Sequence, residues 1–407
     1  MLLTERHIIS KNHRQFKNID SLCFLSKNLY NYANYLIKQH YKETGHFLRY
    51  REIEKQLREN KQIDYVSLPN NSSQQILMLL DKNWKSFFAL IKIFKKNKKE
   101  LSGCPKPPKF KDKVKGRNIV LFTYQQINVK NSFIKFPKKT KLSSLKTNVA
   151  KLQQVRVIPQ STCYVIEVIY EEQEQSLVKN NNYCAIDLGV NNLMTLTFNK
   201  NIKPIVINGK PLKSINQYYN KKKGKLQSDL EKNHKRKTSN RINKLTLKRN
   251  NKINDYIHKT TKKLVDICIK NNISKVVIGC NKGWKQNINI GKRNNQNFVN
   301  IPYLKILQQS EYKLKLKGIF VLLNEESYTS KCSALDLEPV QKQDVYLGKR
   351  IKRGLFKSSK GLLINADVNG SLNIGRKVFN DVFIPVDIGL VMNPVKVNLN
   401  KESYIKL

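Results

Sequence analysis

The sequence predicts an α+β protein of several domains, in which a small N-terminal β-barrel with a helical insert precedes an α/β core. Apolar residues recur with helical spacing through most of residues 19–97. Short runs rich in β-branched and aromatic residues follow up to about residue 170, separated by turn signals. From residue 183 onward, strand-like runs alternate with longer helical segments. A chain of 407 residues is long enough for two or three such domains.

The first half of the chain divides into a barrel and an insert. Residues 1–18 and 98–175 are expected to form a small antiparallel β-barrel or sheet, and residues 19–97 its helical insert, with Asn71-Ser72-Ser73 capping the last long helix. The aromatic residues of that helix are interpreted as core. The strands expected here are residues 2–9, 119–123, 127–129, 133–136, 155–158 and 164–170. A polar stretch over residues 171–182 marks the boundary.

The second half, residues 180–380, is expected to form the α/β core. Residues 301–317 form a helix that tolerates Pro302 in its first turn, and a further helix opens near Asp367. A long helical region, residues 210–271, is broken near residues 234–240. The expected strands are residues 183–190, 193–198, 204–208, 274–280 and 319–324. Residues 381–407 form a C-terminal tail to which the sequence assigns no role.

The charge of the chain predicts a polyanionic partner. Lys and Arg number 77 against 29 Asp and Glu, a formal net charge of +48, which nucleic acid phosphates would neutralise. Ribosomal and chromatin-like proteins share such a charge, but they are usually shorter and need no apolar strand with an embedded Asp. Residues 210–263 hold 18 Lys or Arg and three acids, so this surface is either a solvated face or a phosphate-binding one. The candidate nucleic-acid contacts are Lys221, Lys222, Lys223, Lys235, Arg236, Lys237, Arg241, Lys248, Arg249, Lys349, Arg350 and Arg353.

Cysteine usage and hydropathy indicate a reducing compartment. The seven Cys are scattered and none has CxxC spacing, which is typical of free thiols. The N-terminus lacks the apolar region of a signal peptide, and no apolar run reaches about 18 residues. We therefore expect no membrane partner and a cytoplasmic protein.

Carboxylates stand at the ends of several expected elements. Asp187 lies in an apolar strand, where a carboxylate is costly without a cation nearby, although an Asp before a Gly is also typical of a turn or cap. Glu325 and Glu326 follow the fifth strand, and Asp367 opens the last helix, where it could equally be an N-cap. Two-metal phosphodiester hydrolysis needs about three or four carboxylates around a pair of Mg²⁺ ions. A strand with an inward Asp followed by two hairpin-linked strands is typical of an RNase H-like nuclease core.

The chain resembles the TnpB family of transposon-encoded RNA-guided nucleases. Ala185-Ile-Asp-Leu-Gly-Val-Asn-Asn192 is similar to the family's first RuvC motif, and Asn365-Ala-Asp-Val-Asn-Gly-Ser-Leu-Asn373 to its third. Tyr328-Thr-Ser-Lys-Cys332 resembles the family's Thr-Ser-x-x-Cys segment, and two stretches near residues 68–88 and 105–110 resemble N-terminal ones. The resemblance implies a wedge-like β-barrel with a helical recognition insert, followed by a RuvC nuclease core with Asp187 and Asp367 as catalytic metal ligands. It also implies a guide RNA from the transposon end and double-stranded target DNA with a short adjacent motif. A prokaryotic protein that associates with the nucleoid when it binds DNA is a further implication.

Two departures from the family bear on function. Gly279 stands where the family commonly has a Glu, and the loop at residues 328–362 keeps only Cys332 of a four-Cys zinc ribbon, so zinc is not expected. We expect Glu326 to replace the missing Glu, because related nucleases with a relocated Glu carry it three residues before the Thr, here Thr329. Glu325 is the second choice; the two point to opposite faces if the strand continues through them. The alternatives to an endonuclease are a nuclease-dead RNA-guided DNA-binding protein and an accessory transposition protein.

Overall fold

The protein folds into two compact units, Met1–Glu172 and Gln173–Leu407. The structure is a computed structural model that describes residues 1–149, 151–281, 283, 286, 289, 291–380, 383 and 387–399. Each unit mixes helices and strands, so the expected α and β multidomain architecture is confirmed. None of the described helices is both long enough and apolar enough to cross a membrane.

The strands of the first unit form two antiparallel sheets. The larger sheet has the order β1-β7-β6-β2, and β1 pairs with β7 along its whole length, from Leu2 opposite Glu171 to Ser10 opposite Cys163. These strands are β1 (Leu2–Ser10), β2 (Val120–Thr123), β6 (Leu152–Pro159) and β7 (Cys163–Glu171). The smaller sheet contains β3 (Asn128–Lys130), β4 (Phe133–Lys135) and β5 (Leu145–Lys146). We expected one small barrel or sheet closed by the first strand, whereas the described pairings give two separate sheets, with the short β3–β4 hairpin paired to β5.

The helices of the first unit pack through an aromatic core. They are α1 (Phe16–Thr44), α2 (Tyr50–Glu59), α3 (Ile63–Ser67) and α4 (Asn70–Lys96), with 3₁₀ turns η1 (Lys98–Glu100) and η2 (Lys138–Thr140). Trp84 of α4 is 2% exposed and donates its indole N–H to Oδ1 of Asn34 at 3.0 Å, as expected of a core residue. The predicted Ser cap is wrong: Ser72 and Ser73 are buried inside α4, where their hydroxyls donate to backbone carbonyls, and Pro69 precedes the helix.

The second unit is built on a six-stranded sheet with the order β12-β11-β8-β9-β10-β16. Its strands are β8 (Tyr183–Asp187), β9 (Asn192–Phe198), β10 (Ile205–Asn208), β11 (Lys275–Gly279), β12 (Phe320–Asn324) and β16 (Val395–Val397). β9 runs antiparallel to β8 and β10, whereas β11 runs parallel to β8 and β12. The tail contributes β16, parallel to β10, and α10 (Ile388–Met392), neither of which was predicted; the rest of residues 381–407 lies mostly outside the described residues.

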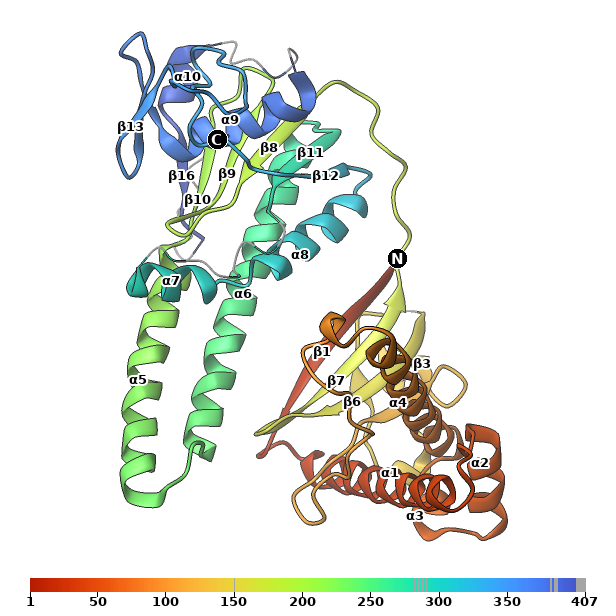
Figure 1. Cartoon of the computed structure of the whole chain (residues 1–407). Coiled ribbons are helices and arrows are strands. Elements are labelled where there is room, and N and C mark those ends of the chain that lie inside the picture. The colour runs from red at the N-terminus through yellow and green to blue at the C-terminus, as the bar shows by residue number, and fades with distance from the viewer. Residues whose placement is uncertain are drawn as a thin grey trace. The chain divides into compact units, whose positions relative to one another are not determined.

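Helices cover both faces of this sheet, as Figure 1 shows. Helix α9 (Ala366–Phe379) covers one face, and α8 (Tyr303–Lys315) with the C-terminal half of α6 (Asn240–Lys270) covers the other. Helices α5 (Lys210–His234) and α7 (Lys292–Val299) lie beyond the end of the sheet in Figure 1. Cys184 and Ile186 of β8 face the apolar cluster made with α6 and α8, and Ala185 faces the cluster made with α9. This alternation is that of a strand buried on both sides.

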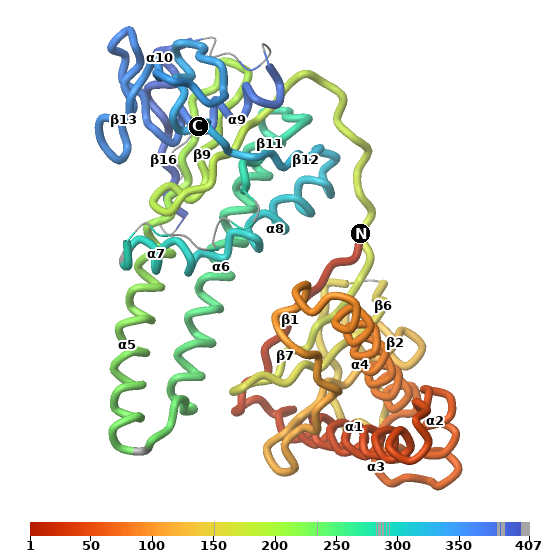
Figure 2. Tube along the Cα trace, in the orientation of Figure 1, coloured from red at the N-terminus to blue at the C-terminus, as the bar shows by residue number. Residues whose placement is uncertain are grey.

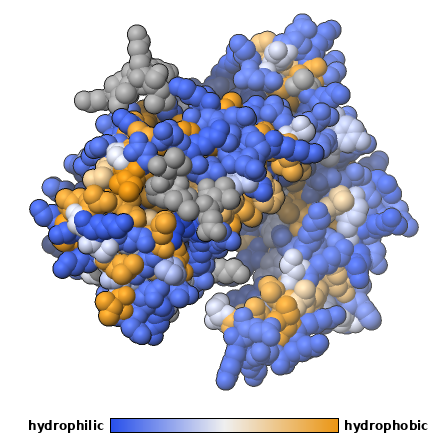
Figure 3. Space-filling view, turned by 90° about the horizontal axis from the view of Figure 1, so that it is seen from above, coloured by the Kyte–Doolittle hydropathy of each residue, from blue (hydrophilic) through white to orange (hydrophobic). Residues whose placement is uncertain are grey.

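Two extensions leave this core. Helices α5 and α6 run antiparallel and extend from the sheet as a long pair (Figure 2), broken at residues 235–239 close to the predicted place. The basic segment expected to be a loop at residues 349–353 instead begins a small sheet of β13 (Lys349–Lys352), β14 (Leu355–Lys357) and β15 (Leu363–Asn365), which leads into α9. The surface seen in Figure 3 is mostly hydrophilic, with apolar residues in scattered groups.

Candidate active site

Asp187 lies at the end of β8, on the face of the sheet that α9 covers. Ala185 belongs to the α9 cluster, and Asp187 follows it at the two-residue spacing of one strand face. Helix α9 is held against β8 by Ser371, whose hydroxyl donates to the carbonyl of Ala185 at 3.0 Å. A methyl group at Gly370 would lie 3.2 Å from Oδ2 of Asp187. Asp187 therefore packs closely against the helix that carries Asp367.

Glu326 lies two residues beyond β12 and turns its carboxylate into the space beside Gly279. A methyl group at Gly279 would lie 2.7 Å from both Cγ and Oε1 of Glu326. Leu322 packs in the α9 cluster, and the alternation through Asn324 puts Glu326 on the same face. The backbone N–H of Glu326 donates to Oδ1 of Asn281 at 3.0 Å, which fixes the chain after the strand. The Glu326 carboxylate thus fills the volume that a side chain at position 279 would take.

Glu325 points elsewhere. It is exposed, and its Oε1 accepts a hydrogen bond from the hydroxyl of Ser327 at 2.5 Å. Among the charges that raise the pKa of Asp187, Glu326 and Asp367 contribute and Glu325 does not. The structure therefore brings together Asp187, Glu326 and Asp367, and leaves Glu325 outside.

Asp367 is the second residue of α9 but does not cap it. The N-cap is Asn365, whose Oδ1 accepts from the N–H groups of Asp367 at 3.0 Å and Val368 at 3.3 Å. The Asp367 carboxylate instead accepts from Nδ2 of Asn192 at 2.7 Å and lies 3.5 Å from the guanidinium of Arg350. The carboxylate of Asp367 is therefore free of the capping role and available to the site.

Burial and mutual repulsion disfavour ionisation in this cluster. Burial, then the charges of Glu326 and Asp367, raise the pKa of Asp187 well above its ordinary value, and Arg350 opposes this. Burial raises the pKa of Glu326 to about 7. Its Oε1 is buried and has no hydrogen-bond partner within the described residues. An unpartnered buried carboxylate oxygen is costly, so the cluster favours an added cation.

The described residues contain no group of three or more His, Cys, Asp or Glu side chains arranged to hold a metal ion. The oxygen of Glu326 without a partner, beside the repelling carboxylate of Asp187, nevertheless fits a hard divalent cation, which prefers carboxylate ligands. Asp187, Glu326 and Asp367 are the residues that would hold such ions. Mg²⁺ remains a prediction here.

Asn192 and Tyr303 are parts of this site that the sequence analysis missed. Asn192 was named only as the last residue of the segment that resembles the first RuvC motif, with no role of its own. Tyr303 is fully buried, and its hydroxyl donates to the carbonyl of Gly189 at 3.1 Å. Burial, then the charges of Asp187 and Glu326, raise the pKa of this hydroxyl, which keeps it neutral. Only the fold brings Tyr303, which opens α8, to the end of β8, so no local signal marked it.

One side of α9 holds the turn that follows Glu326. Nδ2 of Asn373 donates to the carbonyls of Thr329 at 2.9 Å and Cys332 at 2.7 Å. Thr329 in turn donates its N–H, at 3.2 Å, and its hydroxyl, at 2.8 Å, to the carbonyl of Glu326. The helix that carries Asp367 is thereby tied to the segment that carries Glu326.

The loop expected to be a degenerate zinc ribbon, residues 328–362, is closed by a buried carboxylate. Glu338 is 2% exposed and accepts from the N–H groups of Ser333 at 2.6 Å and Leu347 at 3.0 Å. Cys332 is buried, and its Sγ donates to the carbonyl of Gln341 at 3.5 Å. Glu338 thus bridges two parts of the loop; a loop without zinc remains a prediction.

The predicted nucleic-acid contacts fall into two groups. Most are exposed on α5, on α6, on the turn between these helices, or near β13: Lys221, Lys222, Lys235, Arg236, Lys237, Arg241, Lys248, Lys349 and Arg353, with Lys223 half-buried. The guanidinium of Arg249 donates to Oδ1 of Asn216, at 2.7 and 2.9 Å, and to the carbonyl of Asn300 at 3.1 Å, and its role as a nucleic-acid contact stays a prediction. Arg350 lies beside Asp367 rather than on a separate basic surface.

The comparisons with known proteins gave matches to family models and to solved structures. No curated protein matches the chain. A cryo-EM structure of a Cas12f1–sgRNA–target DNA complex is 16% identical over 89% of this chain and 82% of that one, with a TM-score of 0.49. A CRISPR-Cas12f ternary complex is 17% identical over 89% of this chain and 81% of that one, with a TM-score of 0.33. The mini-RNA-guided endonuclease CRISPR-Cas_phi3 is 11% identical over 97% of this chain and 93% of that one, with a TM-score of 0.47. Because these TM-scores lie below 0.5, we draw no conclusion from them.

Two family models match adjacent parts of the chain. Residues 163–285 match OrfB_IS605, a probable transposase, and residues 303–374 match the TNB domain of Cas12f1-like proteins. The first segment contains Asp187, and the second contains Glu326 and Asp367. The resemblance to the transposon-encoded TnpB-like proteins is thereby confirmed for the parts of the chain that hold the candidate site.

Proposed function

We propose that this chain is a transposon-encoded, RNA-guided DNA endonuclease that cuts phosphodiesters by two-metal hydrolysis at a RuvC-type site. The observation that carries the proposal is the position of Glu326, whose carboxylate fills the space left by Gly279 and comes close to Asp187. A nuclease that had lost its function would have no need to replace that carboxylate from another strand.

The second unit fits an RNase H-like core. Three strands joined in sequence, β8 to β10, lie antiparallel, and β11 and β12 extend the sheet in parallel beyond β8. Carboxylates come from the first strand, the end of the fifth and the covering helix α9. The first unit would supply the wedge-like domain and its helical insert.

The side chains around the cluster suggest separate tasks. Asp187, Glu326 and Asp367 would hold two Mg²⁺ ions, which when bound would polarise the phosphodiester and lower the pKa of the attacking water. Asn192 orients the Asp367 carboxylate through its 2.7 Å hydrogen bond. The Arg350 side chain is 45% exposed, so its guanidinium can also reach a phosphate oxygen.

The partners proposed are a guide RNA from the transposon end and double-stranded target DNA with a short adjacent motif. The support is the net charge of +48 and the one-sided basic surface of α5 and α6. Exposed lysines of this pair, such as Lys221 and Lys248, would contact phosphates.

A nuclease-dead RNA-guided DNA-binding protein is the second candidate. It is favoured by one observation, the engagement of the Asp367 carboxylate by Asn192 and Arg350. An accessory transposition protein, the third candidate, would differ from these two only in the step of transposition that the cut or bound DNA serves.

The test is Mg²⁺-dependent target cleavage by Asp187→Asn and Asp367→Asn, each assembled with the transcript of the DNA flanking the coding sequence. We expect each change to slow cutting at least about 100-fold, the scale of losing one preorganised electrostatic contact. RNA binding should be unchanged, and Asp344→Asn, at an exposed position, should cut normally. An unmodified protein that binds its target but never cuts supports the nuclease-dead alternative, and one that binds no RNA contradicts both.

A further inference from the structure

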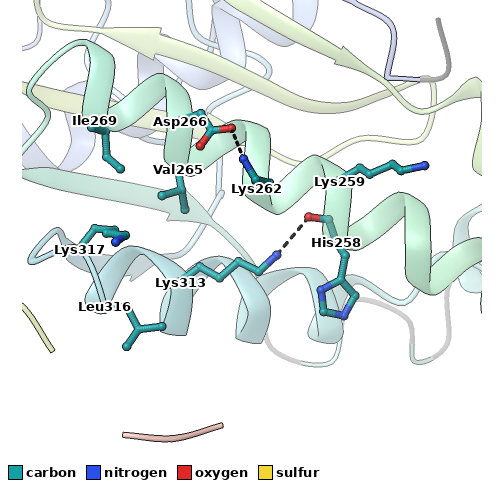
Figure 4. A pocket seen from close by; sticks show the side chains of 9 residues that line it. All are labelled: His258, Lys259, Lys262, Val265, Asp266, Ile269, Lys313, Leu316 and Lys317. Carbon is teal, nitrogen blue, oxygen red and sulfur yellow. Dashed lines mark hydrogen bonds and ion pairs between the residues drawn. The ribbon is translucent and has the colours of Figure 1, made fainter. Parts of the chain in front are cut away.

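A groove opens along the seam between α6 and α8 (Figure 4), with a cavity volume of about 530 Å³. The seam itself is fixed by hydrogen bonds. Oγ1 of Thr261 donates to Oε1 of Gln309 at 3.3 Å, and Nζ of Lys305 donates to Oδ1 of Asn254 at 2.6 Å. These helices cover the face of the sheet opposite the carboxylate cluster, so the groove is separate from the candidate active site.

The groove is strongly basic. Four lysines and one acid, Asp266, line it: Lys259, Lys262, Lys313 and Lys317. Lys262 pairs with Asp266 at 3.1 Å, and Lys259 pairs with Asp255 at 2.8 Å, but all four of these side chains are at least half exposed. Such solvated pairs are weak and exchange readily for another anion.

Lys313 is the fixed cation of the groove. Its Nζ donates to Oγ1 of Thr261 at 2.6 Å and to the carbonyl of His258 at 3.1 Å, the latter drawn in Figure 4. Both acceptors are neutral. Burial, then the charge of Lys262, lower the pKa of Lys313 to about 8, with Asp266 opposing. An ammonium held in place before a ligand arrives, with its charge only partly balanced, is suited to bind an anion.

The other end of the groove carries apolar side chains beside Lys317 (Figure 4). Val265 is buried, while Ile269 of α6 is 51% exposed and faces the same opening as Leu316, which follows α8 (Figure 4). A nucleotide has this same division, with a charged phosphate at one side and a sugar and base with apolar faces at the other. The groove therefore matches a nucleic acid strand better than it matches an isolated inorganic anion.

We propose that this groove is a docking site for the backbone of the guide RNA, with a phosphodiester at Lys313 and Lys262 and the adjoining ribose and base against Ile269 and Leu316. This inference rests on the proposed function, because the guide RNA is the polyanion that the chain would carry before it meets a target. The groove lies along the second half of α6, and the first half of the same helix presents the exposed basic residues Arg241 and Lys248. An acidic protein segment is the other occupant that the charge would admit, and the test below separates the two.

The test compares Lys313→Met with Lys315→Met in the full chain. Lys315 lies on the same helix but pairs with Glu311 at 2.7 Å and does not line the groove. The affinity for the flanking-DNA transcript is measured over a series of salt concentrations. For Lys313→Met we expect a loss of about fivefold at moderate salt and a log–log salt slope lower by about 0.7 to 0.9, the value for one phosphate contact. Lys315→Met should match the unmodified protein in both.

A second measurement follows target DNA binding to the RNA-loaded complex. If Lys313→Met binds RNA as the unmodified protein does, the proposal is overturned, and an acidic protein partner would become the occupant to seek. If RNA affinity is unchanged and only target DNA affinity falls, the groove is a DNA site and the proposal is equally wrong. If the unmodified protein binds no RNA, the proposed function itself fails, an outcome distinct from a fault in the groove.

Discussion

The carboxylate cluster and the lysine groove lie on opposite sides of one sheet and hold buried charges of opposite sign. Burial raises the pKa of Glu326 to about 7 and lowers that of Lys313 to about 8, so both move toward neutral pH. Neither is fully balanced by its neighbours: Oε1 of Glu326 has no hydrogen-bond partner among the described residues, and Lys313 donates to neutral oxygens. The comparison teaches that the free-energy cost of burying a charged group identifies both sites, one suited to a cation and one to an anion.

The two residues should give opposite dependences of stability on pH. The folded protein binds a proton at Glu326 more tightly than the unfolded chain does, whose carboxyl titrates near 4.5. The free energy of unfolding should therefore fall, by up to about 3 kcal/mol, as pH rises from about 4.5 to about 7. For Lys313 the unfolded chain binds the proton more tightly, so stability should rise between pH 8 and 10.5.

Urea unfolding in chelator at a series of pH values measures both dependences. Glu326→Gln should make the fall in stability above pH 4.5 shallower, with the part due to the raised pKa of Asp187 remaining, and should leave the rise between pH 8 and 10.5 unchanged. Lys313→Met should remove that rise and leave the fall above pH 4.5 unchanged. If the free energy of unfolding of Glu326→Gln falls as steeply between pH 4.5 and 7 as that of the unmodified protein, this carboxyl is not the buried group that we describe.

Substitutions at two glycines, one beside the carboxylate cluster and one on a basic helix, should have smaller effects on stability. A methyl group at Gly279 would lie 2.5 Å from Cδ1 of Ile374 and 2.7 Å from Glu326, whereas Gly224, on the basic helix α5, has nothing within 4 Å. Gly279→Ala should destabilise the protein by about 1 to 3 kcal/mol through overpacking and also slow cutting. Gly224→Ala should stabilise it by up to about 1 kcal/mol, because alanine favours the helix. Equal and small effects in thermal unfolding would mean that Glu326 does not fill the space beside Gly279.

Much of the fold could be predicted because the pattern of each element is local. The alternation of β8 and the helical spacing of α1 and α6 are visible in the sequence. β16 was missed because its three residues lie in an aperiodic tail and pair with β10, far away in the chain. The Ser cap of α4 was wrong because Ser72 and Ser73 find carbonyl partners in other segments.

Less of the candidate site than of the fold could be predicted from the sequence. Asp187 and Asp367 stood in recognisable motifs, and the two-residue alternation allowed only one of Glu325 and Glu326 to face them. The choice of Glu326 came from the resemblance, through its position three residues before Thr329. Tyr303, and the roles of Asn192 and Arg350 beside the carboxylates, depend on long-range packing that no local pattern encodes. Lys313 is distinguished from its neighbouring lysines only by its burial between α6 and α8.

The central claim, that Glu326 completes the active site in place of a residue at Gly279, is tested most directly by comparing Glu326→Gln with Glu325→Gln. The measurement is Mg²⁺-dependent cleavage of target DNA by each RNA-loaded variant, with RNA binding measured on the same preparations. Both substitutions remove one carboxylate at adjacent positions, but Glu325 is exposed whereas the buried Oε1 of Glu326 lies beside Gly279. We predict that Glu326→Gln abolishes cutting with RNA binding intact, while Glu325→Gln cuts as the unmodified protein does. Normal cutting by Glu326→Gln would contradict the assignment.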